Sequence, residues 1–197
     1  MNFVGKAEKL QPSDIEEVAH NLGVEVAALR AVLAVETGGR GVDDAHRPKA
    51  LFERHHFYKY LANRLDLQAE AVELGLAYAK WGEKPYPRKS DGVYAEIEAA
   101  CKLDETSALL STSWGLGQIM GSNFKLAGCT SVAQMVEEAK ESEANQLRHM
   151  AAFIHSAGLL DELTNKDWAK FARGYNGPGY ATNKYDVKLA EAYEQFA

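Results

Sequence analysis

A single carboxylate, Glu36, lies near the end of a mostly small and aliphatic stretch at residues 29–39, which reads LRAVLAVETGG. Helical spacing puts Leu29, Leu33 and Glu36 on one face, so the acid continues an apolar stripe. Burial on such a face would raise the pKa of the carboxyl group, which suits a general acid. The glycines at positions 38, 39 and 41 would let a ligand approach the helix end. The alternative is a terminal glutamate that bends back into water.

A second carboxylate, Glu53, lies in the aromatic segment 51–58 after a polar loop. Two carboxyl groups brought into one site can act as acid and base, the pair that glycoside hydrolysis uses. The alternative for Glu53 is an ion pair with Arg54 or with a lysine. Asp43 and Asp44, in the loop between the two segments, are the reserve candidates for the second carboxylate.

No metal site is expected at the adjacent histidines His55 and His56. Neighbouring residues point to different sides of a helix or strand, so a metal ion would need further ligands from elsewhere. Nothing in carboxylate chemistry requires a metal, and we therefore expect no cofactor.

A glycine-punctuated stretch at residues 113–121, SWGLGQIMG, is neither a regular helix nor a regular strand throughout. Its glycines could bring backbone amides close to a ligand, with Trp114 as a flat apolar surface and Gln118 as an amide donor and acceptor. Such groups suit a sugar. The alternative, which composition alone favours, is a tight turn with a core tryptophan. Likewise Tyr175 and Asn176 offer a phenol and an amide at a helix end, or only a helix cap and turn.

The elements that must position these residues are predicted to be mostly helical. Capping boxes at Ser13 and Ser131 begin two of the helices, and the two-proline loop 81–88 is the expected boundary between two lobes. At most a short hairpin fits near residues 42–56. The expected helices cover residues 13–23, 24–36, 59–80, 94–101, 104–112, 131–141, 145–157, 165–175 and 184–195.

Composition indicates an ordinary globular chain of 197 residues, long enough for one domain with a substantial core. The net charge of −6, with scattered basic residues, argues against nucleic acid as a partner. Two cysteines, Cys101 and Cys129, exclude a disulfide scaffold; two buried thiols are favoured over a bridge between them. The N-terminus lacks the apolar region of a signal peptide, so we expect synthesis in the cytoplasm and no stable membrane insertion.

Three blocks in this order resemble the signatures of the lysozyme-like superfamily, which includes goose-type lysozymes and soluble lytic transglycosylases. The blocks are residues 35–39 (VETGG), 115–120 (GLGQIM) and 174–177 (GYNG). The chain more closely resembles the N-acetylmuramidase family of phage endolysins. That family also carries blocks similar to residues 51–55, 113–121 and 171–179, and the resemblance runs from about Leu10 to Phe196.

This resemblance implies a mostly α, lysozyme-like fold with two helical lobes around a glycan cleft. It implies a peptidoglycan hydrolase that cuts the β-1,4 bond between N-acetylmuramic acid and N-acetylglucosamine. Glu36 falls on the position of the general acid, and Ser113, Trp114, Gln118, Tyr175 and Asn176 fall in the blocks that line the cleft. Thr37 and Gly117 stand where the wider superfamily usually has serine and methionine, which removes no proton-transferring group.

Several alternatives remain open at this point. Glu53 is our candidate for the second, water-activating carboxylate, but a lytic transglycosylase needs only one glutamate and leaves anhydro products. A non-catalytic glycan-binding module is the third hypothesis. We expect a monomer of one catalytic domain without a separate cell-wall-binding domain, acting on the cell wall after release from the cytoplasm. Either a phage lysin or a delivered bacterial effector fits, and the sequence predicts neither retention nor inversion.

Overall fold

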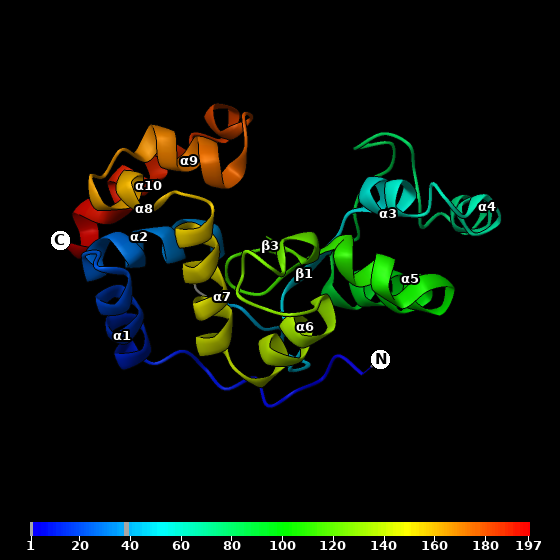
Figure 1. The fold of residues 1–197 in the computed structure, drawn as a ribbon, viewed down its shortest axis with the longest axis horizontal. Helices are drawn as coiled ribbons and strands as arrows, with labels where there is room; N and C mark the ends of the chain where they lie inside the picture. The colour runs from blue at the N-terminus through cyan, green and yellow to red at the C-terminus, as the bar shows by residue number, and fades with distance from the viewer. Residues whose placement is uncertain (1, 38–39) are drawn as a thin grey trace.

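The computed structural model describes the backbone of residues 2–37 and 40–197, and all side chains in these ranges except those of Glu36 and Thr37. Two groups of helices lie on either side of a small sheet (Figure 1). The prediction of a mostly helical, two-lobed fold is confirmed.

The first group of helices contains the C-terminus, and an extended N-terminal segment runs from below α6 (Val132–Glu141) to the start of α1 (Figure 1). The first group consists of α1 (Pro12–Leu22), α2 (Val26–Thr37), α7 (Glu143–Ser156), α8 (Leu160–Thr164), α9 (Trp168–Asn176) and α10 (Tyr185–Phe196). The stripe predicted on α2 is buried, since Leu29 and Leu33 are 0% and 7% exposed. Helix α10 packs along α2, so the helix that carries Glu36 is held from both sides by α1 and α10.

The second group consists of α3 (Arg54–Tyr60), α4 (Leu65–Glu73) and α5 (Ser90–Leu110). Helix α6 (Val132–Glu141) packs against both α5 and α7 and so joins the two groups below the sheet (Figure 1). Two short 3₁₀ turns, η1 (Gly121–Asn123) and η2 (Tyr180–Asn183), complete the described helical elements.

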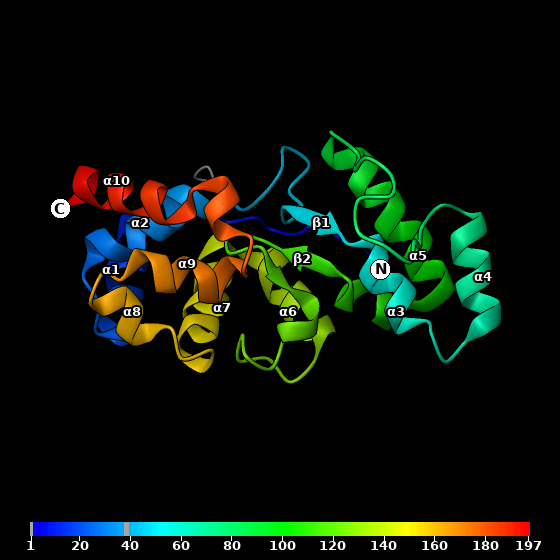
Figure 2. The same ribbon diagram turned by 90° about the horizontal axis from the view of Figure 1, so that it is seen from above.

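The sheet has three short antiparallel strands in the order β1 (Ala50–Phe52), β2 (Thr112–Trp114) and β3 (Ile119–Met120). Leu51 pairs with Ser113, which pairs with Met120, so these three side chains share one face. Figure 2 looks onto β1 and β2 between the two groups of helices. The β2–β3 hairpin was not predicted from the sequence. The hairpin expected at residues 42–56 forms only an isolated Val42–Pro48 bridge, because β1 pairs with β2 instead.

Most helix boundaries agree with the prediction, and the differences have local causes. Helix α1 begins at Pro12 rather than at a Ser13 cap, because a proline at the first helical position loses no hydrogen bond and Asp14 accepts from the amide of Gln11. The Ser131 cap is confirmed, since its hydroxyl accepts from the amide of Gln134 at 3.1 Å. The predicted break between residues 101 and 104 survives as a kink at Asp104 inside α5.

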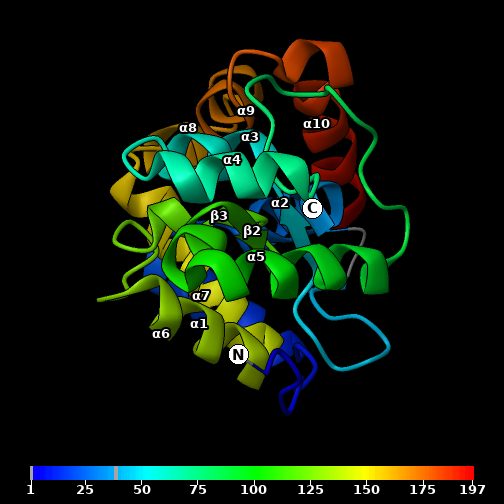
Figure 3. The ribbon, with the colours of Figure 1, turned by 90° about the vertical axis from the view of Figure 1, so that its right-hand side faces the viewer.

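The helix predicted over residues 59–80 was wrong at residues 61–64, where a turn separates α3 from α4, and beyond Glu73. Gly75 has a φ of +73°, a left-handed conformation that ends the helix. The chain from there to Ser90 is a loop that runs along the outside of the second group to the start of α5 (Figure 3). This loop reaches the candidate site described below.

None of the described helices is by itself long and apolar enough to span a membrane. Helices α1 and α2 reach that length and composition only together, and the pair is bent by 115° at the break between them.

Candidate active site

Glu36 lies in the last turn of α2, as predicted, but its side chain falls outside the described residues, as do the glycines at positions 38 and 39. The structure does define what holds the chain after this helix end. The buried carboxylate of Glu143, at the start of α7, accepts from the backbone amide of Gly41 at 2.6 Å and from that of Leu10 at 2.9 Å. Glu143 therefore ties the loop after α2 and the segment before α1 to one point.

The same face of α7 fixes the β2–β3 turn. Gln146, 2% exposed, accepts from the amide of Leu116 at 2.8 Å and donates to the carbonyl of Ala139 at 2.8 Å. A side chain at Gly41 or at Gly115 would collide with Gln146, so both glycines are required for this close approach. Helix α7 therefore sets the loop after Glu36 and the turn before Gln118 relative to each other.

Gln118 and Ser113 form a small polar cluster at this turn. The Gln118 amide donates to the carbonyls of Gly115 at 2.8 Å and Lys49 at 3.3 Å, and its oxygen accepts from the Ser113 hydroxyl at 3.1 Å. Gln118 has a φ of +45°, an uncommon conformation for a non-glycine residue, which these bonds hold in place. Its side chain is half-buried at the surface of the turn, whereas Ser113 is buried.

Trp114 lies in the core, and the expectation that it offers a flat surface to a ligand was wrong. It is 2% exposed, its ring stacks on Phe3 with centroids 5.8 Å apart, and its indole N–H donates to the carbonyl of Leu109. The strand register explains this, because Trp114 pairs with Ala50 and Ile119 on the face opposite to Ser113.

Tyr175 reaches the β2–β3 turn from α9. Its hydroxyl donates to the carbonyl of Gly117 at 2.9 Å, and its ring packs between Phe153 and Phe171. A Cβ at position 117 would lie 2.8 Å from this hydroxyl, which explains glycine at this position. Asn176, the last residue of α9, is half-buried beside it in the chain.

Glu53 lies at the other end of β1, at the N-cap position of α3. Its carboxylate accepts from the Tyr86 hydroxyl at 2.5 Å, and its side chain is 16% exposed. Alternation along the strand places it on the face of Leu51 and Ser113, opposite to the buried Phe52. The carboxylate therefore sits at the edge of the less buried face of the sheet.

Arg54 does not pair with Glu53, so the ion-pair alternative with this residue does not apply. Its guanidinium binds both carboxylate oxygens of Glu96, at 2.5 and 3.1 Å, and the carbonyl of Pro85 at 3.2 Å. It also lies over the ring of Tyr86, 5.4 Å from the centroid. This buried arginine holds the loop so that the Tyr86 hydroxyl meets Glu53.

Tyr86, His55 and His56, which lie near Glu53, are neutral at pH 7. Burial, followed by the hydrogen bond to Glu53, raises the pKa of Tyr86 well above its ordinary value, so the phenol keeps its proton. Nδ1 of His55 lies 3.4 Å from the same carboxylate oxygen without a hydrogen bond to a described residue. Burial lowers the pKa of His55, and burial together with His55 lowers that of His56. No neutralising cation is therefore placed on Glu53 by these groups.

The reserve carboxylates are engaged elsewhere. Asp43 accepts from the backbone and the guanidinium of Arg47 at 2.9 and 2.8 Å and from the Ser90 hydroxyl. Burial raises the pKa of Asp43, but these hydrogen bonds outweigh it and leave the pKa lowered. Asp44 is 93% exposed and pairs with Arg40. Neither shares the polar cluster of Glu53.

The structure thus forms two polar clusters along one short strand. The Gln118 amide meets the carbonyl of Lys49 just before β1, and Glu53 lies just after β1, about 13 Å further along if each residue spans about 3.3 Å. Tyr175 joins the turn of Gln118, Ser113 lies between the two ends opposite Leu51, and His55 and Tyr86 gather at Glu53. Sequence reasoning missed Tyr86 and the loop's exposed Trp81, which line a small hollow with His55. The two prolines of this loop marked a boundary, but nothing local signals its contact with Glu53.

Comparison with known proteins agrees with the resemblance described above. Residues 25–197 match the family Muramidase, described as N-acetylmuramidase. The crystal structure of the Burkholderia AP3 phage endolysin is similar, with a TM-score of 0.85 and 39% sequence identity over 96% of this chain and 72% of the endolysin chain. None of the curated proteins searched gave a match.

Proposed function

Because the chain belongs to the N-acetylmuramidase family, we propose that it hydrolyses the β-1,4 bond between N-acetylmuramic acid and N-acetylglucosamine in bacterial peptidoglycan. Family membership makes it a glycosidase that acts on peptidoglycan. We further propose which bond is cut, by which mechanism, and which residues take part. The likeness to a phage endolysin supports action on the cell wall during lysis.

The two-carboxylate mechanism is supported by the groups that surround the Glu53 carboxylate. A neutral phenol orients its carboxylate, a neutral imidazole lies beside it, and Arg54 is occupied by Glu96. A carboxylate held in this way keeps lone pairs for the proton of a water molecule. It is therefore suited to act as a general base rather than as half of an ion pair.

In the proposed reaction, Glu36 gives its proton to the glycosidic oxygen while positive charge develops on the muramic acid ring. Glu53 takes a proton from a water molecule, whose oxygen forms the new bond to the anomeric carbon. Proton transfer on both sides leaves a neutral leaving sugar and a reducing muramic acid end. A water between carboxylates roughly 6.5–9.5 Å apart gives inversion of the anomeric centre.

Substrate contacts are assigned to the cluster around Gln118 and Tyr175 and to the exposed loop that carries Trp81. Gln118, Tyr175 and Asn176 remain the candidates that line the glycan site, with Ser113 acting through its hydrogen bond to Gln118. Trp81, 70% exposed on the loop that carries Tyr86, takes the stacking role once expected of Trp114. Two clusters spread along a strand suit a chain substrate that runs across the sheet.

The experiment that tests the function uses purified peptidoglycan, the wild-type protein and the Glu36→Gln variant. We expect wild-type protein to release soluble muropeptides, and the variant to lose most of this activity while keeping its circular dichroism spectrum and melting temperature. The matched control is Glu73→Gln on the exposed side of α4, which should retain full activity. Binding of both proteins without release of fragments would instead establish a glycan-binding module.

A further inference from the structure

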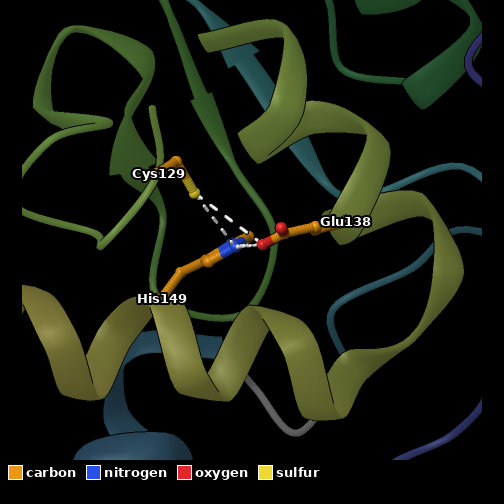
Figure 4. Close-up of side chains that lie close together, drawn as sticks. All are labelled: Cys129, Glu138 and His149. Carbon is orange, nitrogen blue, oxygen red and sulfur yellow. Dashed lines mark hydrogen bonds and ion pairs between the residues drawn. The ribbon is translucent and has the colours of Figure 1, made fainter. Parts of the chain in front are cut away.

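A second group of chemically active side chains lies away from the candidate active site, where α6 and α7 pack together. Cys129 comes from the loop after η1, Glu138 from α6 and His149 from α7, and their side chains converge (Figure 4). Cys129 and His149 are 6% and 5% exposed, and the Glu138 side chain is 40% exposed. The proposed reaction uses none of these residues.

Two of the three distances among the ligand atoms are close to those of a metal site. The Cys129 sulfur lies 3.5 Å from Nε2 of His149 and 3.8 Å from a Glu138 oxygen, which lies 2.8 Å from that nitrogen. Ligand atoms on a tetrahedral zinc ion, at bond lengths of about 2.0–2.3 Å, stand roughly 3.3–3.6 Å apart. Both sulfur distances are close to this range. The nitrogen–oxygen distance is shorter because those two atoms share a hydrogen bond.

The same geometry argues against a catalytic Cys–His–Glu triad. In such a triad the acid holds one ring nitrogen while the other nitrogen faces the thiol. Here a single nitrogen, Nε2, meets both the sulfur and the carboxylate (Figure 4). Three donors aimed at one point instead describe a cation site.

The surroundings hold the three donors in place. Gln134 donates to the second oxygen of Glu138 at 2.8 Å, and its own side-chain oxygen accepts from the backbone of Thr130 at 2.9 Å. One glutamine thus connects the carboxylate on α6 to the residue next to Cys129. Outer contacts of this kind orient metal ligands in proteins and tune their affinity.

We propose that Cys129, Glu138 and His149 bind a zinc ion that fastens the loop after η1 to helices α6 and α7. Sulfur and imidazole ligands select zinc over magnesium or calcium, which prefer oxygen. The exposed side of Glu138 gives the ion a path of entry and room for a water molecule as the fourth ligand. His149 lies three residues after Gln146, so the ion would steady the helix that fixes the β2–β3 turn.

The test is zinc binding to untagged protein that has been stripped with a chelator, measured by competition with a chromophoric chelator. We expect one equivalent to bind with submicromolar affinity. Cys129→Ser and His149→Gln should each weaken binding by on the order of 100-fold or more, and Gln134→Ala by roughly 10–100-fold. Cys101→Ser is the matched control and should bind like wild type, because Cys101 lies on α5 outside the cluster.

Two further measurements do not depend on the folding of the cysteine variant. Cobalt added to wild-type and Cys101→Ser protein should give a thiolate-to-cobalt charge-transfer band, which assigns the sulfur to Cys129. Zinc at 100 times its dissociation constant should raise the melting temperature by roughly 5–11 °C. Absence of stoichiometric zinc binding, or a cobalt band lost in Cys101→Ser, would overturn the proposal.

Discussion

Two glutamates of this chain, Glu53 and Glu138, each lie beside a histidine, and the two surroundings differ in how the donor atoms are aimed. At Glu53 the imidazole nitrogen stands 3.4 Å away without a hydrogen bond, and a tyrosine hydroxyl orients the carboxylate. At Glu138 the imidazole nitrogen is hydrogen bonded at 2.8 Å, and a thiol faces the same nitrogen. From the first arrangement we infer a carboxylate that can act as a base, and from the second a set of ligands for one metal ion.

The difference shows why residue types alone do not identify a site. Both clusters contain a glutamate and a histidine, and in both the histidine is at most 15% exposed. Only the direction of the donor atoms separates a proton-transferring carboxylate from a metal ligand. Variants around Glu53 therefore test this distinction.

The largest effect is expected for Glu53→Gln. An amide cannot take the proton of a water molecule, so the rate of fragment release should fall by roughly 10²–10⁴-fold without loss of the fold. The measurement is initial rates on soluble peptidoglycan fragments, with Glu73→Gln as the control for loss of an acidic residue. A Glu53→Gln variant with near wild-type rates would remove Glu53 from the mechanism.

Arg54→Ala should cause the largest loss of stability. The variant leaves the Glu96 carboxylate, 20% exposed in the present pair, without its partner, and breaking a buried pair in this way costs about 3–5 kcal/mol. The melting temperature should fall by roughly 6–20 °C. Arg40→Ala, which breaks the exposed pair with Asp44, is the control and should cost less than about 1 kcal/mol. Equal shifts in the two variants would contradict the role of Arg54 as the anchor of the loop.

Tyr86→Phe removes the hydroxyl that orients Glu53 and keeps the ring that packs on Arg54. A hydrogen bond to a charged group is worth about 1.5–3 kcal/mol, so kcat/KM should drop roughly 10–100-fold, mainly through kcat. The lost bond should also lower the melting temperature by roughly 3–12 °C, so steady-state kinetics are measured well below it to separate this effect from a folding defect. A change confined to KM would make Tyr86 a substrate contact instead of a positioning residue.

Trp81→Ala tests whether the exposed loop meets the glycan. Loss of an aromatic contact worth about 0.5–1.5 kcal/mol should raise KM roughly 2–10-fold and leave kcat and stability nearly unchanged. Leu65→Ala, at a similarly exposed apolar position on α4, is the matched control. An unchanged KM in Trp81→Ala would place the glycan elsewhere.

The smallest effect is a difference in pH dependence between the two clusters. Burial lowers the pKa of His55 and His56 below the unfolded value of 6.5, so the unfolded chain binds more protons and stability falls as the pH drops below about 6.5. The hydrogen bond from His149 lowers the pKa of Glu138, so its contribution is lost only at lower pH, below its ordinary value of 4.5. In the double variant His55→Asn/His56→Asn, the free energy of unfolding should no longer fall as the pH drops below about 6.5. It should still fall at lower pH, below the ordinary pKa of 4.5 of a glutamate. A wild-type pH dependence in this variant would contradict the assignment.

Local features of the fold were predictable because their causes are local. The Ser131 cap and the buried stripe of α2 follow from residues only a few positions apart. The pairing of β1 with β2 joins segments about sixty residues apart, and no periodicity signals it. That register decides that Trp114 is buried, which is why its predicted role as a ligand surface was wrong.

The residues of the candidate site could be proposed from their types and from the resemblance, but their contacts could not. Both kinds of reasoning indicated Gln118 and Tyr175, and the structure joins them through the β2–β3 turn. Tyr86 reaches Glu53 across thirty-three positions, and its segment was interpreted only as a loop between lobes. The cluster around Cys129 likewise depends on three elements that come together only in the folded chain.

The central claim, hydrolysis with Glu53 as the water-activating base, is tested most directly by product analysis in water enriched in heavy oxygen. Mass spectrometry of wild-type digests should show reducing N-acetylmuramic acid ends that carry one heavy oxygen, with their yield sharply reduced for Glu53→Gln. Anhydro-muramic acid ends without heavy oxygen, formed equally well by Glu53→Gln, would contradict the account and identify the reaction as transglycosylation.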